Sequence, residues 1–154
     1  MHPDTMRFID RWAGIPLCFF TSLLLWKKNK TVASKKVADT IVFIGIAEIG
    51  ALVVAFPAIQ EARKQNPNSR VCFITAPAGK QTLELMGFDE KDILLIRTSS
   101  IQNILGDIIK LRNAFKKVSV SAVVLEPFTR FSTLVASWIG ASKRIGCYRF
   151  LAEG

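Results

Sequence analysis

Apolar runs alternate with segments of helical periodicity along most of the chain. Residues 40–46 are apolar at almost every position, which is typical of a strand buried on both faces, as in a parallel sheet. A glycine-containing turn at residues 47–50 follows, and residues 52–62 have the pattern of a helix that is buried at its start and solvated at its end. Backbone N–H groups and the helix dipole at such a corner favour an anion.

The same alternation continues along the rest of the chain. The predicted strands are residues 40–46, 70–76, 92–97, 118–125 and one that begins at 144–146, and the predicted helices are residues 52–62, 77–86, 101–115 and 128–139. This succession predicts an α/β fold, a doubly wound parallel sheet with right-handed crossovers. We expect residues 40–46 at the centre of the sheet, because they are the least interrupted by polar groups.

The helix at residues 101–115 shows the clearest periodicity. Its expected core positions are Ile101, Ile104, Leu105, Ile108, Leu111 and Phe115. Asp107, Lys110 and Arg112 are expected on the opposite, solvated side.

Residues 12–26 contain no charge and have basic residues on both sides. As a helix they would be about 22 Å long, short of the roughly 30 Å hydrocarbon core of a bilayer, so a simple span would be strained. A cleavable signal peptide is disfavoured, because no small-x-small site follows. A helix packed on the domain remains open, but we favour an interfacial or re-entrant anchor with tryptophans at headgroup depth.

Charge and cysteine content narrow the class of protein. Residues 1–36 contain seven Lys/Arg and two Asp/Glu, so they hold +5 of the formal net charge of +9. Because this excess lies beside the most apolar segment, it indicates an anionic membrane surface rather than nucleic acid. Cys18, Cys72 and Cys147 are far apart, which is typical of free thiols in a reducing compartment. With His2 as the only histidine, no histidine triad or metal site is expected.

Polar side chains follow the predicted strands at the carboxyl edge of the sheet, where open parallel sheets bind ligands. They are Glu48, Lys80, Arg97, Thr98, Glu126, Thr129 and Arg130. Arg130 is the best candidate for an anionic group, because a guanidinium can hold a phosphate or carboxylate through two hydrogen bonds. A surface ion pair with Glu126 is the alternative.

Residues 45–50 nearly spell the dinucleotide fingerprint G-x-G-x-x-G. Alanine replaces the second glycine, and Glu48 would place a negative charge beside a pyrophosphate. No acid follows the second strand for the ribose hydroxyls. The glycines are therefore interpreted as permitting a tight turn, and no nicotinamide or flavin cofactor is expected.

Four segments occur in an order and spacing that resemble a known family. They are AEIG at 47–50, PAIQEARKQNP at 57–67, EPFTRFSTL at 126–134 and KRIGCYRF at 143–150. Together they resemble the N-terminal half of family 9 glycosyltransferases, which include the heptosyltransferases of lipopolysaccharide core assembly. The resemblance covers about residues 40–154, and part of the family also has a leading segment like residues 8–26.

The resemblance implies a GT-B enzyme, in which two Rossmann-like domains face each other across a cleft. The N-terminal domain receives the acceptor, and the C-terminal domain holds the nucleotide-sugar donor, ADP-heptose in the heptosyltransferases. Residues 1–36 would then be a membrane-associated segment with a basic linker, and residues 37–154 a Rossmann-like acceptor-side domain. Because the sequence ends soon after the fifth predicted strand begins, we expect the donor domain to be absent from it and to be a partner.

The resemblance also implies site positions. The acceptor-side positions are Gly50, Ala51, Lys80, Glu126, Thr129 and Arg130. Gly45 stands where many members have lysine or arginine, and Ala51 stands where they have the aspartate proposed as catalytic base. An inverting transfer needs a base for the acceptor hydroxyl's proton, so Glu48 is the nearest substitute. A solvated loop glutamate, or a partner of Lys80, is the alternative for Glu48.

Two functions are expected from these patterns. The first is the N-terminal half of a glycosyltransferase that moves a heptose-like sugar from a nucleotide sugar to an acidic, lipid-linked saccharide in cell-envelope glycan synthesis. It would work at the cytoplasmic face of a bacterial inner membrane, and this chain alone would be inactive. The alternative is a non-catalytic remnant of the family that binds a glycolipid or a partner subunit, which the loss of the aspartate at Ala51 favours.

Overall fold

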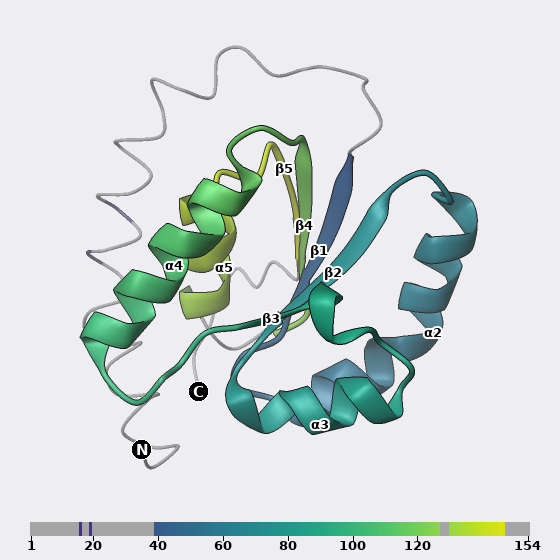
Figure 1. The fold of residues 1–154 in the computed structure, drawn as a ribbon, viewed down its shortest axis with the longest axis horizontal. Helices are drawn as coiled ribbons and strands as arrows, with labels where there is room; N and C mark the ends of the chain where they lie inside the picture. The colour runs from purple at the N-terminus through teal and green to yellow at the C-terminus, as the bar shows by residue number, and fades with distance from the viewer. Residues whose placement is uncertain (1–15, 17–18, 20–38, 127–129, 147–154) are drawn as a thin grey trace.

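A computed structural model describes residues 16, 19, 39–126 and 130–146 of the chain (Figure 1). Within these ranges, five strands form one sheet: β1 (Thr40–Ile44), β2 (Arg70–Thr75), β3 (Ile93–Leu95), β4 (Val120–Val124) and β5 (Lys143–Gly146). All neighbouring strands are parallel, and their order is β3-β2-β1-β4-β5. The predicted doubly wound α/β fold is therefore confirmed, with β1 at the centre of the sheet.

Two pairs of helices cover the sheet. Helices α2 (Ile49–Gln65) and α3 (Pro77–Leu85) lie on one face, and α4 (Ile101–Phe115) and α5 (Arg130–Trp138) lie on the other (Figure 1). A short 3-10 turn, η2 (Glu90–Asp92), precedes β3. The chain thus forms three layers with a separate hydrophobic core on each side of the sheet.

The central strand shows why its sequence is continuously apolar. Val42 and Ile44 belong to the core beneath α4 and α5, whereas Phe43 belongs to the core beneath α2 and α3. The Phe43 ring stacks on Phe73 of β2 at a centroid distance of 5.5 Å, and Phe73 meets Phe88 edge to face at 5.2 Å. Because both faces are buried, no polar residue can alternate with the apolar ones.

Two glycines bring α2 and α3 close to the carboxyl edge of the sheet. A Cβ at Gly45 would lie 2.8 Å from Leu52 Cδ2, and a Cβ at Gly79 would overlap Thr75 Oγ1 and lie 3.2 Å from Leu52 Cδ1. The fully buried Leu52 therefore packs between the two glycines. Any longer side chain at Gly45 would have to displace this leucine.

Several predicted boundaries shift by a few residues. Helix α2 begins at Ile49 rather than residue 52, β3 and β4 are shorter than predicted at both ends, and Asp92 belongs to η2. Strand pairing ends where the neighbouring strand ends, which a single-strand pattern does not reveal. The predicted start of the fourth helix, residues 128–129, lies outside the described residues.

Several predictions for the ends of the chain fall mostly outside the described residues. Only residues 16 and 19 of the predicted anchor at 12–26 are described, and Cys18 and Cys147 are not. Among the helices that the structure describes, none is long and apolar enough to cross a membrane. Cys72 is a buried free thiol, and burial raises its pKa to about 11, so it is unreactive at neutral pH.

Candidate functional site

The strand order reverses direction at β1, since β2 and β3 lie on one side of it and β4 and β5 on the other. Open α/β sheets bind ligands at such a switch point, outside the carboxyl ends of the strands. The segments that leave β1 and β4 run beside each other here, and the Leu125 N–H donates to the Ile44 carbonyl at 3.0 Å. Residues 45–48 and 125–126 therefore form the floor of the switch point.

Glu126 occupies this switch point with its own carboxylate. Its side chain is buried, with the residue 3% exposed. Oε1 accepts hydrogen bonds from the backbone N–H groups of Ala47 and, at 2.9 Å, Glu48, and Oε2 accepts one from Ser132 Oγ of α5. The corner that the sequence predicts to favour an anion thus binds an anion supplied by the chain itself.

Glu48, the predicted substitute base, is the N-cap residue of α2. Its side chain is partly exposed, and among the described residues it forms no ion pair, with Lys80 or any other cation. Its backbone position is fixed by the bond to Glu126. Gly50 lies two residues further on, where an added Cβ would meet no atom within 4 Å, and Ala51 is half-buried beside it. The surface around Glu48 and Gly50 is therefore open to solvent.

Lys80, in the first half of α3, forms ion pairs with two nearby acids. Its Nζ lies 2.5 Å from Glu90 Oε1 and 3.6 Å from Glu84 Oε1. The bond to Glu90 raises the pKa of Lys80 and lowers that of Glu90. Because the Glu84 and Glu90 side chains are exposed and that of Lys80 is partly exposed, these ion pairs are weak. An anionic ligand would have to compete with the two carboxylates for Lys80.

Arg97 forms the strongest ion pair at this edge. Its Nε and Nη2 donate to the two carboxylate oxygens of Asp107 at 2.9 and 2.8 Å, and its backbone N–H donates to Oδ2 at 3.0 Å. Asp107 is only 6% exposed, which contradicts its predicted place on the solvated side of the helix. These hydrogen bonds outweigh burial and lower the pKa of Asp107 to about 2. The guanidinium is therefore held by α4 and is not aimed at a ligand.

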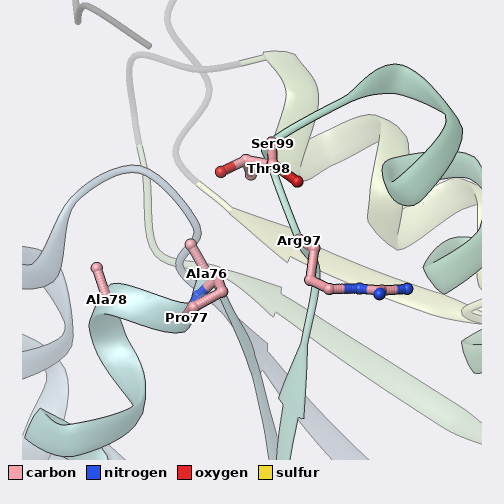
Figure 2. A pocket seen from close by; sticks show the side chains of 6 residues that line it. All are labelled: Ala76, Pro77, Ala78, Arg97, Thr98 and Ser99. Carbon is pink, nitrogen blue, oxygen red and sulfur yellow. The ribbon is translucent and has the colours of Figure 1, made fainter.

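A shallow hollow of about 330 Å³ opens between the ends of β2 and β3. It is lined by Ala76, Pro77, Ala78, Arg97, Thr98 and Ser99 (Figure 2). Figure 2 shows the Arg97 guanidinium pointing away from this hollow, toward α4. What remains is a lining of small apolar side chains and two hydroxyl groups, which suits a neutral polyol better than a phosphate.

The predicted site residues therefore do not form a single cluster. The structure brings Glu48, Gly50, Ala51 and Glu126 together at the switch point, and it places Arg130 at the start of α5, two residues before Ser132. Lys80 lies at the same edge but on α3, in its own ion pairs. Thr129 lies outside the described residues.

Sequence reasoning missed Ser132 and Asp107 as members of this edge. Each is a polar residue among buried positions of its helix, beside Leu134 and Val135 in α5 and beside Ile108 and Leu111 in α4. A polar residue at such a position needs a partner, and that is the signal that identifies both. In the described part of the chain, no three His, Cys, Asp or Glu side chains gather as a metal site would require.

These features define a doubly wound, Rossmann-like α/β domain whose switch point is occupied by an internal carboxylate. No protein-family model, curated protein or solved structure significantly matches the chain. The geometry of the switch point and the resemblance in sequence therefore remain the grounds for a function.

Proposed function

We propose that this domain is the acceptor-binding half of a GT-B glycosyltransferase. The enzyme would move a heptose-like sugar from a nucleotide sugar to an acidic, lipid-linked saccharide during cell-envelope glycan synthesis. A second, donor-binding domain would hold the nucleotide sugar. Residues 1–36 would anchor the domain at the cytoplasmic face of the inner membrane.

The observation that supports this assignment most is the Glu126 carboxylate at the switch point. A domain that binds a nucleotide at this corner directs its backbone N–H groups at a phosphate. Here the N–H groups of Ala47 and Glu48 bind Glu126 instead. A diphosphate would lose both donors and would meet the charges of Glu126 and Glu48, so the corner suits a saccharide acceptor better than a nucleotide donor.

Glu48 is the residue that we propose as general base. As the acceptor hydroxyl attacks the anomeric carbon, its proton would pass to the Glu48 carboxylate, the glycosidic C–O bond would form and the nucleoside diphosphate would leave with the bonding electrons. Two observations support this role: the side chain is partly exposed, and it forms no ion pair within the described part of the chain. Ala51, less than one turn further along α2, has no group that accepts a proton.

Arg130 is the residue that we propose for the anionic group of the acceptor. It begins α5, the helix that carries Ser132 to Glu126, so it lies at the same edge as the proposed base. In an open, hydrated edge, one such contact contributes no more than about 1 kcal/mol. The domain alone should therefore bind an acidic saccharide with a millimolar dissociation constant at best.

NMR titration of the 154-residue chain with a phosphorylated, sugar-acid core oligosaccharide tests this proposal. We expect amide shifts at residues 48–51 and 130–132 that Arg130→Ala abolishes. Arg112→Ala is the matched control, because Arg112 is an exposed arginine in the last turn of α4. The amide shifts of this variant on titration should equal those of the wild type. Tight binding of a nucleotide sugar, with shifts at residues 48–51, would show that donor and acceptor sides are exchanged.

The second candidate is a non-catalytic relative that binds a glycolipid or a partner subunit. Ala51 supports it, because the resemblance places the catalytic aspartate there. Adding a donor-binding domain from a family 9 enzyme to the chain discriminates the two candidates. Transfer that Glu48→Gln lowers by about a hundredfold or more indicates an enzyme. Saccharide binding without transfer indicates the non-catalytic relative.

A further inference from the structure

The outer side of α4 exposes apolar side chains that its sequence pattern assigns largely to the core. Ile101, Leu105 and Ile109 are 75%, 48% and 59% exposed. They follow each other at intervals of four residues and therefore lie in one line along the helix. Arg112 and Lys116 continue the line, since they come three and seven residues after Ile109 and Lys116 keeps helical dihedrals. These five residues are called the α4 stripe below.

The charges of the α4 stripe have one sign. Its cations, Arg112 and Lys116, are exposed, and the only acid of α4, Asp107, is buried in its bonds to Arg97. Cations near a helix C-terminus stabilise the helix dipole, which accounts for Arg112. The dipole gives no reason for three exposed Ile and Leu side chains, whose hydration is unfavourable unless something covers them.

We propose that the α4 stripe lies on an anionic lipid bilayer. An apolar line that ends in cations is the pattern of a helix that rests in the interface, with its apolar side chains among the acyl chains and its cations at acidic headgroups. A protein partner or a second copy of the chain would cover the apolar part but would have to supply acids opposite the basic end. This surface goes beyond the proposed function, because it does not require that the domain bind a saccharide.

The position of α4 gives the surface a consequence for the site. Ser99 lines the hollow at the carboxyl edge, and Ser100 caps α4 by accepting a hydrogen bond from the Asn103 N–H at 3.2 Å. The apolar end of the α4 stripe therefore begins two residues from the hollow. A domain that rests on α4 holds the carboxyl edge of its sheet next to the lipid headgroups.

Co-sedimentation of the full chain with vesicles tests the proposal. The vesicles contain equal amounts of phosphatidylglycerol and phosphatidylcholine, and each variant is compared with the wild type. Leu105→Gln with Ile109→Gln should lower the partition coefficient about tenfold or more. The matched control is Val53→Gln with Val54→Gln, which removes two exposed apolar side chains from α2 on the opposite face of the sheet and should change nothing.

Arg112→Gln with Lys116→Gln tests the basic end. Each cation near an anionic surface contributes about fivefold, so this pair should lower the partition coefficient about 25-fold. Lys64→Gln, an exposed lysine at the end of α2, is the control and should bind as the wild type does. On vesicles of phosphatidylcholine alone, the loss from Arg112→Gln with Lys116→Gln should disappear.

Residues 1–36 contribute equally in every variant, so the ratio to the wild type reports on α4. Circular dichroism and thermal melting confirm that each variant is folded, which we expect because all substituted side chains are exposed. The proposal is overturned if the α4 variants bind as the wild type does, if the α2 control falls equally, or if the intact chain does not bind. Saccharide shifts in the NMR titration are independent of all these results.

Discussion

Glu126→Ala is the substitution from which we expect the largest effect at the switch point. The carboxylate joins three parts of the fold: it accepts two hydrogen bonds from the turn between β1 and α2 and one from Ser132 of α5. Ala47 is exposed, so its N–H can turn to water once the carboxylate is gone. Ser132 is fully buried, so its hydroxyl group cannot form a hydrogen bond with water instead. The variant therefore loses all three hydrogen bonds to the carboxylate, and water does not replace the one from Ser132.

The magnitude follows from these bonds. A hydrogen bond to a charged group contributes about 1.5–3 kcal/mol, and water replaces part of the loss at the turn, so Glu126→Ala should lower the free energy of unfolding by about 3–4 kcal/mol. Glu126→Gln should cost only about 1 kcal/mol. Its carbonyl can still accept both N–H bonds, and its amide can donate to Ser132 Oγ. Urea unfolding followed by circular dichroism measures both variants.

An anion should partly rescue Glu126→Ala. With the carboxylate removed, the N–H groups of Ala47 and Glu48 become available to inorganic phosphate. Phosphate at ten times its dissociation constant should then stabilise this variant by about 1.4 kcal/mol. The wild type and Glu126→Gln should gain nothing beyond the effect of sodium chloride at equal ionic strength. A Glu126→Ala variant as stable as the wild type, or equal stabilisation of all three by phosphate, would refute the reasoning.

Three further predictions concern the edge and the isolated chain. Arg97→Ala should destabilise the fold at pH 7, because the Asp107 carboxylate loses the guanidinium that lowers its pKa to about 2. A lowered pKa stabilises the fold above the unfolded value near 4, so in urea titrations the difference from wild type should shrink between about pH 4 and pH 2. A stability difference between Arg97→Ala and the wild type that stays constant down to pH 2 would contradict this prediction. Gly79→Ala should cost about 1–3 kcal/mol, since the new methyl group overlaps Thr75 Oγ1. Gly106→Ala, which meets no atom within 4 Å, should instead gain about 0.5–1 kcal/mol. Melting temperatures that rise in both variants would show that the packing at Gly79 is looser than described. The 154-residue chain should not transfer sugar, because it holds only one side of the proposed cleft, and turnover in a radiolabelled transfer assay would exclude that division of roles.

The order of elements and the place of the central strand could be predicted from the sequence. An apolar run such as residues 40–46 is a local signal, because a strand buried on both faces needs apolar residues at consecutive positions. The carboxyl edge could also be predicted, since strand direction alone determines which loops gather there. The polar residues of these loops, Glu48 and Glu126 among them, were therefore placed at the same edge before their contacts were known.

The side of α4 that faces the sheet could be predicted only in part. Ile104, Ile108, Leu111 and Phe115 pack in the core as predicted, whereas Ile101 and Leu105 are exposed. Apolar residues cover a wide arc of the helix, so periodicity leaves its rotation about its own axis partly open. The bonds between Arg97 and Asp107 select the orientation that buries the acid and leaves Leu105 exposed. The helix therefore buries one charged residue beside Ile108 and Leu111, and its remaining apolar side chains face outward.

The tertiary structure also determines which group binds the backbone N–H groups of the turn after β1. Ala47 and Glu126 are 79 residues apart, and only the parallel pairing of β1 with β4 brings the carboxylate to the backbone N–H. The sequence determines that this corner attracts an anion, because its glycines and helix start are local. The sequence does not determine which group supplies that anion. A hydrogen bond between distant segments depends on strand order, and strand order is a property of the folded chain.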